Sequence, residues 1–586
     1  MGLRVCIVTP FAWSAPHSVN DHVSASAAEL ERRGHEVVVV APSTRARDLA
    51  NGRRALRRLL REGRPLEGLV ALSPAVRVSR RSRIGLPVGV QAALELVLSA
   101  DRFDVVHVHD PGVPSLANVA VRKARGLTVA TFHSAERLGY PPGKAQRQKL
   151  LARLDALTAT TEAALEAARE RFPGDYTRLP LGIDLMQFRP AEERRRFVLE
   201  WRSEDAARAA TAIRALRELP EWELVVLRTR PLGGRPYVPI ALAGRVLVRR
   251  AFESGERAAE LAGAAGFVPA TRGVDRLRAE AEATGVPVVD PPAAAEQPAL
   301  VAAAMARLAE DDDWRRSRSQ AARARAEAES TARLGDELET IYRTVATRRR
   351  PPARLLGPGG RDTILCDLHL HTEHSYDCSI PVADLLDHAE AAGLGAVAIT
   401  DHNAFTGAQE ALRLSGARQL TVIPGEEVKT AGQGEVIGLF VDEEIAPGMS
   451  MDETIAAIRE QGGLVYLPHP FDRMHTIPDV RTLHRHLPEI DVFEVYNARL
   501  LRDAFNDEAL RFARKYNLTM GAGSDAHVLQ GVGTGLVRMR RFEGPEEFLL
   551  SLQSAEVVRR PKSLVYLQGL KWVAQARERR AKAAVR

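Results

Sequence analysis

Apolar, β-branched runs alternate with Ala-, Leu- and Arg-rich stretches of helical periodicity over roughly the first 185 residues. The apolar runs predict buried strands. Their regular alternation with helices is typical of a parallel sheet covered by helices on both faces. The predicted strands of this region are Arg4–Thr9, Glu36–Ala41, Val105–His109, Thr128–Phe132 and Ala156–Thr160.

A second alternating region lies between about residues 196 and 345. Its predicted strands are Phe197–Leu199, Glu223–Leu227, Arg245–Val248, Gly266–Val268 and Pro287–Val289. An Arg-, Pro- and Gly-rich stretch then interrupts the pattern, and this composition favours a linker. Short strands resume at Ile364. We therefore predict domains at 1–190 and 191–346, a linker at 347–361, and a third domain at 362–586 with a basic helical tail.

In the third predicted domain, nearly every short strand is followed by a polar residue that can bind a metal ion. His369 and His371 are two residues apart, so both side chains point the same way from an extended chain. In barrel enzymes the strand ends at one mouth carry the catalytic residues. The candidate residues at these strand ends are His369, His371, Asp377, Asp401, His402, Glu426, Glu427, Glu435, His469, Asp525 and His527.

Burying so many ionisable groups without a metal would cost several kcal/mol for each group. Their repetition on strand after strand therefore predicts a metal centre rather than isolated structural histidines. Mixed ligation by imidazole and carboxylate suits divalent Zn, Mn or Fe, and the number of candidate ligands implies more than one ion.

Five motifs follow one another in this region: HLHTEHSYD, ITDH, PGEE, LPHP and GSDAH. With them, residues 362 to about 560 resemble the polymerase and histidinol phosphatase (PHP) family. The resemblance implies a distorted (β/α)7 barrel with two or three bound ions, which hydrolyses a phosphate ester with metal-activated water. The small phosphorylated substrate is not identified by the sequence.

The resemblance also implies a role for each candidate ligand. His369, His371 and Asp525 would hold the first ion. Glu427, rather than Glu426, would bridge the first and second ions. The remaining assignments are His469 to the second ion and Asp377, His402 and His527 to the third. The residues expected to be catalytic are His369, His371, Glu427, Asp525 and His527.

Glu435 departs from the commoner family pattern, in which a histidine at this strand start binds the second ion. A carboxylate can replace an imidazole as a ligand and would favour Mn or Fe. We favour ligation by Glu435, and the alternative is that this side chain faces solvent. His374 and His475 lie in predicted loops near the mouth, where contact with phosphate is the alternative to simple solvent exposure.

The first two domains carry the motifs VVHVHDP, ATFHS and LPLGID, which resemble the retaining glycosyltransferases of family 4, and especially their phosphatidylinositol mannosyltransferase-like branch. This resemblance implies the GT-B fold, in which two Rossmann-like domains bind a nucleotide or nucleotide-sugar in the cleft between them. The fold class we predict is therefore α/β, with a GT-B region followed by a PHP barrel.

Three donor-site features of that family are missing. Pro16-His17-Ser18-Val19 replaces a Gly-Gly turn that approaches the donor phosphates. Glu200 lies in a segment that normally supplies cations to the diphosphate, where a carboxylate would repel it. Of two family glutamates eight residues apart, the second falls on Glu280 and the first on Arg272. His109 and His133 are retained, so the acceptor side can still bind a ligand. We expect impaired sugar transfer.

Composition adds less. The chain has 586 residues, of which 45% are hydrophobic and 27% charged, with three cysteines and a net charge of +7. No apolar stretch is long enough to span a membrane, and no signal peptide is recognisable, so we expect a cytoplasmic protein. The Arg-rich segment 53–61 predicts a surface helix that buries Leu56, Leu59 and Leu60. Peripheral contact of such basic helices with a membrane is the alternative.

Two functions from different classes follow. In the first, the chain is a metal-dependent phosphoesterase whose GT-B region binds a ligand, positions a substrate or supports assembly. In the second, it is a bifunctional enzyme that also transfers a sugar from a nucleotide-sugar. A third alternative makes both regions binding modules, and the full set of metal ligands argues against it.

Overall fold

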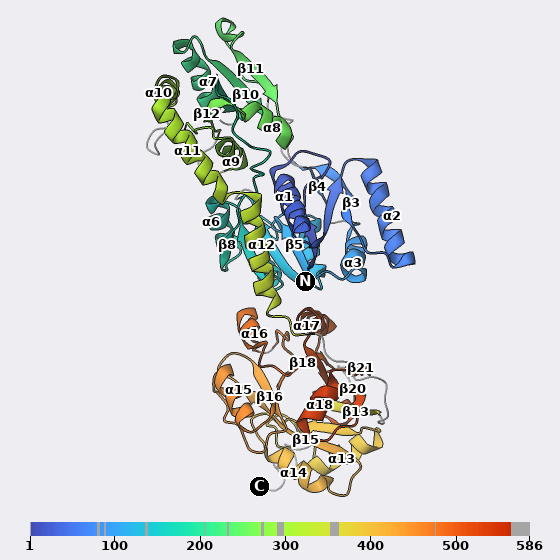
Figure 1. The fold of residues 1–586 in the computed structure, drawn as a ribbon. Helices are drawn as coiled ribbons and strands as arrows, with labels where there is room; N and C mark the ends of the chain where they lie inside the picture. The colour runs from blue at the N-terminus through green and yellow to red at the C-terminus, as the bar shows by residue number, and fades with distance from the viewer. Residues whose placement is uncertain are drawn as a thin grey trace. The chain divides into compact units, whose positions relative to one another are not determined.

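The computed structural model describes residues 2–78, 83–86, 89–134, 139–203, 206–230, 234–270, 275–289, 298–351, 363–474 and 476–563. They form two compact units, Met1–Ala346 and Thr347–Arg586. The first unit contains two α/β halves, and the second contains a barrel (Figure 1).

A mostly parallel sheet forms the first half of the first unit. Within the described residues its order is β4-β3-β2-β1-β5-β6-β7-β8, and only β3 and β4 pair antiparallel. The five predicted strands are present, whereas β3, β4 and β8 were not predicted. The strands are β1 (Arg4–Val8), β2 (Glu36–Ser43), β3 (Gly68–Arg77), β4 (Arg83–Gly85), β5 (Val105–His109), β6 (Leu127–Phe132), β7 (Ala156–Ala159) and β8 (Tyr176–Arg178).

The helices of this half bury apolar side chains against the sheet. They are α1 (Ser18–Arg32), α2 (Ala46–Glu62), α3 (Gln91–Ala100), α4 (Leu116–Lys123), α5 (Lys144–Leu151) and α6 (Glu162–Arg171). Helix α2 corrects one prediction. Leu59 is buried and Leu56 is partly buried against the core, but Leu60 is 58% exposed. Successive helix residues lie about 100° apart, so the narrow buried stripe of α2 takes in Leu59 and not its neighbour.

The second half of the first unit has a smaller parallel sheet, ordered β11-β10-β9-β12 in the described chain. The predicted strand Pro287–Val289 is reduced to an isolated bridge between Phe267 and Val288. The elements are β9 (Arg194–Glu200), β10 (Glu223–Arg228), β11 (Val246–Arg250), β12 (Ala264–Val268), α7 (Ala206–Ala215), α8 (Ser254–Leu261), α9 (Arg276–Ala283), α10 (Pro298–Glu310), α11 (Asp312–Ala328), α12 (Thr331–Ala346), and the 3-10 turns η3 (Leu216–Glu218) and η4 (Ile240–Leu242).

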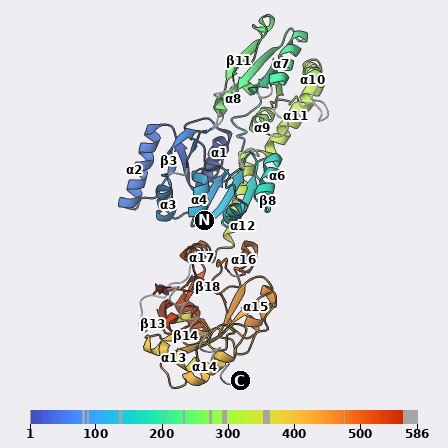
Figure 2. The same cartoon turned by 180° about the vertical axis from the view of Figure 1, so that it is seen from behind.

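Helix α12 returns to the first half and packs beside α1 (Figures 1 and 2). The Arg33 guanidinium on the α1 side pairs with Asp336 at 3.0 Å and with Glu339 at 3.2 Å. The buried Tyr342 hydroxyl lies 2.8 Å from Nδ1 of His107 on β5. Helix α12 therefore belongs to the packing of the first half, although it follows the second half in sequence.

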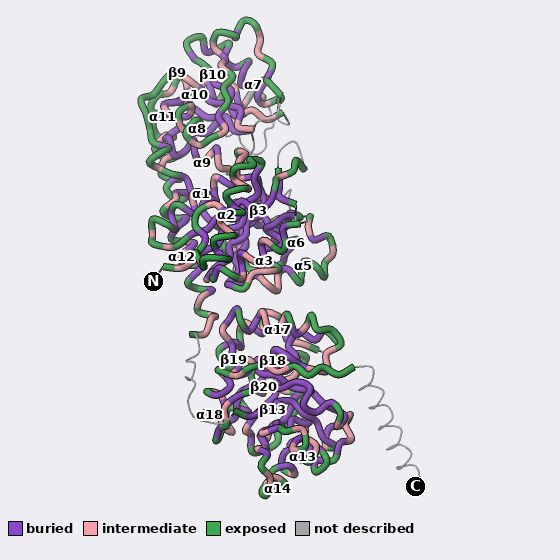
Figure 3. Tube along the Cα trace, turned by 90° about the vertical axis from the view of Figure 1, so that its right-hand side faces the viewer, coloured by how far each residue is buried: buried purple, intermediate pink, exposed green. Residues whose placement is uncertain are grey.

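The second unit is a curled sheet, which the described residues arrange as β19-β18-β17-β16-β15-β14-β13-β20-β21. The strands β13, β18 and β20 have mostly buried residues (Figure 3). The elements are β13 (Thr363–Leu370), β14 (Ala396–Ile399), β15 (Thr421–Lys429), β16 (Glu435–Leu439), β17 (Leu464–Leu467), β18 (Val492–Asn497), β19 (Thr519–Gly523), β20 (Gly535–Arg540), β21 (Glu556–Arg559), α13 (Val382–Ala391), α14 (Thr406–Ser415), α15 (Met451–Glu460), α16 (Val480–His486), α17 (Asp503–Tyr516), α18 (Gly544–Leu552), and the 3-10 turn η5 (Leu529–Gly531).

The barrel nearly closes where the end of β19 meets β13. The Asp525 amide donates to the His369 carbonyl at 2.8 Å, and the His371 amide donates to the Ala526 carbonyl at 3.3 Å. We call this junction the seam. Gly523 is required there because a Cβ atom on it would lie 2.3 Å from the Cβ of His369.

One strand distorts the barrel, because β16 runs antiparallel to both β15 and β17. The first residue of β16, Glu435, pairs with Lys429 at the carboxyl end of β15. Reversal of this strand therefore brings its first residue, rather than its last, to the end of the barrel where the neighbouring parallel strands finish.

The predicted linker is only partly within the described chain. At its start, the Arg350 amide donates to the carbonyl of Tyr516, and its guanidinium donates to the carbonyl of Leu487 at 2.7 Å. Arg350 is thus anchored on the barrel unit. Residues 352–362 and the basic tail after residue 563 lie outside the described residues. No helix in the described part of the chain is both long and apolar enough to cross a bilayer.

Candidate metal centre

The structure brings the nine predicted ligands together at the end of the barrel where the parallel strands finish. They come from the ends of strands or from the loops that follow them, and β16 contributes its first residue because it runs antiparallel to its neighbours. They are His369, His371, Asp377, His402, Glu427, Glu435, His469, Asp525 and His527.

Glu427 lies at the middle of this cluster. Its carboxylate oxygens are 3.0 Å from Nε2 of His469, 3.1 Å from Nδ1 of His402 and 3.3 Å from Nε2 of His369. Burial alone would favour the protonated acid, but His369 and His402 hold the pKa of Glu427 well below its usual range. An ionised carboxylate reached from several sides has the geometry that a bridging ligand needs.

A second group joins His369 and His371, at the end of β13, to the aspartate that follows β19. Nε2 of His369 and Nε2 of His371 are 3.1 Å apart, and Nε2 of His371 is 3.4 Å from Oδ1 of Asp525. Burial and the neighbouring His527 hold the pKa of His371 well below its ordinary value. Its imidazole is therefore neutral and offers a lone pair to a cation.

A third group lies around His527. The potential ligand atoms of His371, His402 and His527 lie within 4.8 Å of one another. Asp377 approaches this group from the loop after β13, with its carboxylate 3.0 Å from Nε2 of His527 and 3.7 Å from Nε2 of His402. Asp377, His402 and His527, which the resemblance assigns to a third ion, therefore lie close together.

Glu435 also reaches the cluster. Its Oε2 lies 3.7 Å from Nε2 of His469, and its ligand atoms group with those of His402 and Glu427. The side chain is 15% exposed and therefore points mainly into the protein. This position suits a ligand better than the alternative, a side chain facing solvent.

Sequence reasoning missed the buried residues that orient the histidines. Glu494 on β18 lies 3.2 Å from Nδ1 of His369, and its other oxygen accepts from the His469 amide at 2.6 Å. Ser375 Oγ lies 3.0 Å from Nδ1 of His371 and donates to Asp401. Contacts of this kind fix which ring nitrogen faces the metal, and they raise its basicity.

Arg499 is the cation beside the cluster that the sequence did not indicate. Its guanidinium lies 3.0 Å from Oδ1 of Asp525, 3.2 Å from Nε2 of His527 and 3.7 Å from Oδ2 of Asp377. A guanidinium at the edge of a metal centre can bind phosphate oxygens through two parallel hydrogen bonds. The sequence offers only a faint signal, an arginine shortly after the strand that carries Glu494.

Three other candidates do not face the cluster or lie outside the described residues. His374 turns to helix α14, where its ring nitrogens lie 2.8 Å from Thr406 Oγ1 and 3.0 Å from Glu410. Glu426 points to the opposite face of β15 and accepts from the Ile445 amide at 2.8 Å. Burial raises the pKa of Glu426 to about 7. His475 is not among the residues that the structure describes.

The donor set fits divalent transition metals. Imidazoles and carboxylates, most of them buried, form four overlapping groups of three potential ligands. Such mixed nitrogen and oxygen ligation is typical of Zn, Mn and Fe. Without cations, the facing carboxylates and ring nitrogens would carry a heavy desolvation cost.

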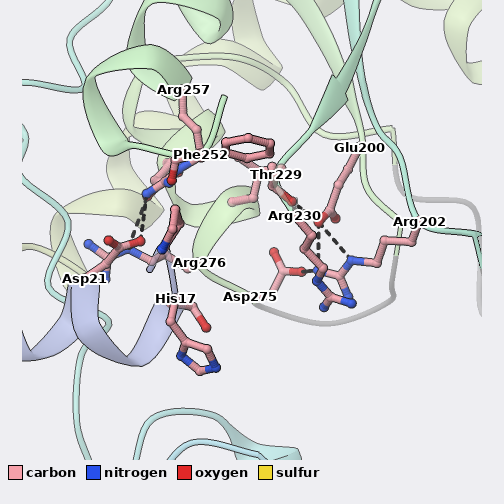
Figure 4. Close-up of a pocket in the computed structure, with 14 residues that line it drawn as sticks. His17, Asp21, Glu200, Arg202, Thr229, Arg230, Phe252, Arg257, Asp275 and Arg276 are labelled. Carbon is pink, nitrogen blue, oxygen red and sulfur yellow. Dashed lines mark hydrogen bonds and ion pairs between the residues drawn. The ribbon is translucent and has the colours of Figure 1, made fainter. Parts of the chain in front are cut away.

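In the first unit, residues from the three segments compared above with the family donor site line one pocket between its two halves. The pocket is lined by His17 from the turn before α1 and by Glu200 at the end of β9 (Figure 4). Glu280 on α9 also lines it. Arg272 is outside the described residues. The structure therefore places two of the substituted segments and the retained Glu280 around a common cavity.

Three arginines that line this pocket are paired with carboxylates. Nε of Arg202 donates to Glu200 at 2.8 Å, and Nε of Arg257 donates to Glu280 at 2.6 Å. Arg276 donates to the same Glu280 at 3.1 Å. Burial and the nearby Asp275 raise the pKa of Glu200 to about 7. The guanidinium charges are thus largely neutralised by the protein itself.

The protein-family models that match this chain cover its two units separately. Residues 19–187 match the model of Glycosyltransferase Family 4. Residues 367–501 match the PHP domain, and residues 503–557 match the PHP-associated model.

Among curated relatives, an uncharacterised protein of Methanocaldococcus jannaschii is 35% identical over 212 residues, which are 34% of this chain and 84% of that protein. A phosphatidyl-myo-inositol mannosyltransferase of Mycolicibacterium smegmatis is 29% identical over 199 residues, which are 32% of this chain. The chain spans 46% of that enzyme's length. A solved glycosyltransferase of Rickettsia africae is 11% identical, with a TM-score of 0.41 over 59% of this chain and 98% of that one.

The ordered motifs, the barrel and the matching family models agree on the second unit, and the α/β halves and their model agree on the first. The chain therefore carries a PHP domain in its C-terminal barrel and a region similar to glycosyltransferase family 4 in its N-terminal unit.

Proposed function

We propose that the barrel hydrolyses phosphate esters at a centre of two or three divalent ions held by the nine clustered ligands. The observation that carries this proposal is the position of Glu427, whose carboxylate is approached by three histidines from separate strands. Ions bound there would supply Lewis acidity and an activated water for attack on phosphorus.

The side chains around the centre have distinct roles in this proposal. Glu494 and Ser375 hold His369 and His371 with their Nε2 atoms toward the ions. Arg499 contacts a phosphate oxygen of the substrate, since its guanidinium already lies at the edge of the cluster. The substrate is a small phosphorylated molecule.

The test is hydrolysis by the full chain, first of p-nitrophenyl phosphate and then of phosphorylated metabolites and short oligonucleotides. We expect hydrolysis that a chelator abolishes and that added Mn, Fe or Zn restores, because the ligands are on the protein and the ions are exchangeable. Elemental analysis of the same sample gives the bound metal. A chain that holds at least one equivalent of metal but hydrolyses none of these compounds would contradict the proposal.

We further propose that the first unit does not transfer sugar from a nucleotide-sugar in the usual way. The supporting observation is that Arg202, Arg257 and Arg276 are each engaged by a carboxylate in the pocket. Binding a diphosphate there would require these pairs to break, and Glu200 and Glu280 would then repel it.

The corresponding experiment incubates the full chain with UDP- and GDP-sugars and measures released nucleoside diphosphate. We expect no release above the rate without protein. A second incubation adds phosphatidylinositol as acceptor, because an acceptor-dependent enzyme can be silent without one. Release that depends on the protein in either incubation would support the alternative, a bifunctional enzyme.

A further inference from the structure

Three histidines from separate elements of the first unit meet in its interior. His22 lies on α1, His109 is the last residue of β5, and His133 follows β6. Their potential ligand atoms all lie within 4.8 Å of one another. None of the three is among the residues that line the pocket between the two halves.

The rings face one another closely. Nδ1 of His109 lies 2.8 Å from Nε2 of His133. The ring centroid of His22 is 4.9 Å from that of His133 and 5.7 Å from that of His109. His22 and His109 are buried, and His133 is half-buried.

Neighbouring oxygens orient two of the rings. Nδ1 of His22 lies 3.2 Å from the Leu181 carbonyl oxygen. Because a carbonyl can only accept, Nδ1 carries the proton and the lone pair of the neutral ring is on Nε2. Nδ1 of His133 lies 3.3 Å from Oγ1 of Thr160, which leaves its Nε2 toward His109. This pattern, in which an outer oxygen fixes the ring and the other nitrogen faces inward, is common for metal-binding histidines.

Two of these rings each have one nitrogen without a protein partner. Among the described residues, Nε2 of His22 and Nε2 of His109 are buried without a hydrogen bond. A buried ring nitrogen left in this way carries an energetic cost.

A nearby histidine shows the ordinary structural arrangement. His107, also on β5, is buried, but its Nδ1 lies 2.8 Å from the Tyr342 hydroxyl and its Nε2 lies 2.6 Å from Oγ1 of Thr131. Both of its nitrogens are satisfied by the protein. The cluster of His22, His109 and His133 differs, because Nε2 of His22 and Nε2 of His109 have no such partner among the described residues.

We propose that His22, His109 and His133 form a binding site for one Zn²⁺ ion in the first unit. Three neutral imidazoles are a known ligand set for zinc, and they leave a fourth position for water or a ligand oxygen. The ends of parallel strands in an open α/β sheet are also where such folds bind ligands. This site is independent of the phosphoesterase proposed for the barrel.

The experiment measures bound zinc in the full chain after equilibration with excess Zn²⁺ and removal of the free ion. His109→Gln and His133→Gln should each lower the content by one equivalent relative to wild type. Hydrolysis of p-nitrophenyl phosphate by the barrel should stay unchanged. His107→Gln is the matched control, and its zinc content should equal that of wild type.

Unchanged zinc content in the folded His133→Gln protein would overturn the proposal, as would an equal loss in His107→Gln. Because His109 is fully buried and its variant can fail to fold, the half-buried His133 carries the test in that case. A second readout uses Co²⁺ in place of Zn²⁺. The visible absorption of tetrahedral cobalt should be present in wild type and absent in His133→Gln, and equal spectra would contradict the site.

Discussion

Replacing His369 and His371 together by alanine is expected to lower the phosphoesterase activity of the full chain by more than about 100-fold. Changes to residues that only orient a ligand typically cost ~10–100-fold, and this change removes two proposed ligands directly. His369 and His371 both approach Glu427, and His371 also approaches Asp525, so both proposed ion positions around them would be weakened. The measurement is metal-dependent hydrolysis of p-nitrophenyl phosphate with bound metal determined in parallel.

His388→Ala is the matched control for that change. His388 is also a histidine of the barrel unit, but it lies near the end of helix α13 and is not in any of the ligand groups. Its variant should keep wild-type activity and metal content. Circular dichroism should show that both variants are folded. A folded double variant with wild-type activity would show that the hydrolytic centre is elsewhere.

Glu435→Ala is expected to weaken the proposed second ion specifically, with a loss of at least ~10–100-fold in metal affinity or activity. The physical reason is the loss of a carboxylate that lies 3.7 Å from His469 and groups with Glu427 and His402. Glu435→His should restore activity and shift the preference toward Zn, because imidazole is a softer donor than carboxylate. Titration of each variant with Mn and with Zn measures both effects.

Glu426→Gln serves as the control for Glu435. Glu426 is buried on the other face of β15 and accepts a hydrogen bond from the Ile445 amide. Glutamine keeps this acceptor and the side-chain volume, whereas alanine would leave a cavity and disturb the fold. Glu426→Gln should behave like wild type. A collapse of Glu426→Gln beside a normal Glu435→Ala would mean that the two carboxylates have been assigned to the wrong faces.

Much of the fold could be predicted from the sequence because buried parallel strands are continuous apolar runs. All five strands predicted for the first half are present, and β5 has the predicted bounds Val105–His109. In strand β18 the apolar run is interrupted by Glu494, so the pattern alone does not mark it as a buried strand. That carboxylate faces His369 rather than solvent, so the interruption was itself a trace of the site.

The direction of β16 could not be predicted from strand alternation alone. A reader of the sequence expects parallel strands throughout a barrel of this kind, yet β15 and β16 form an antiparallel pair joined by a short turn. In that turn Gly432 and Gly434 both have positive φ, 76° and 98°. A short glycine-containing connection between two strands is typical of a hairpin. It explains why Glu435 reaches the centre from the first residue of its strand.

The individual ligand roles came from the family resemblance and stay predictions, while the structure shows that these side chains lie close together. The partners of the ligands could not be predicted. Glu494 and Arg499 are far in sequence from His369 and Asp525, and Ser375 lies in the HLHTEHSYD motif but shows its contact with His371 only in the fold. The charge pairs of the first unit are similar. Arg257 and Glu280 form an ion pair in the wall of the pocket. Only the folded chain shows that this carboxylate already offsets the charge of the Arg257 guanidinium.

The seam has a consequence for the order in which this protein matures. During synthesis, His369, His371 and Glu427 leave the ribosome long before Asp525 and His527, and domains fold as units once their sequence is available. The early ligands therefore cannot be held in their final geometry until β19 returns to β13 and Gly523 admits the close approach to His369. Loading of the proposed metal centre would then be a late event, because a ribosome-bound chain that stops before the seam lacks the aspartate that completes the proposed site.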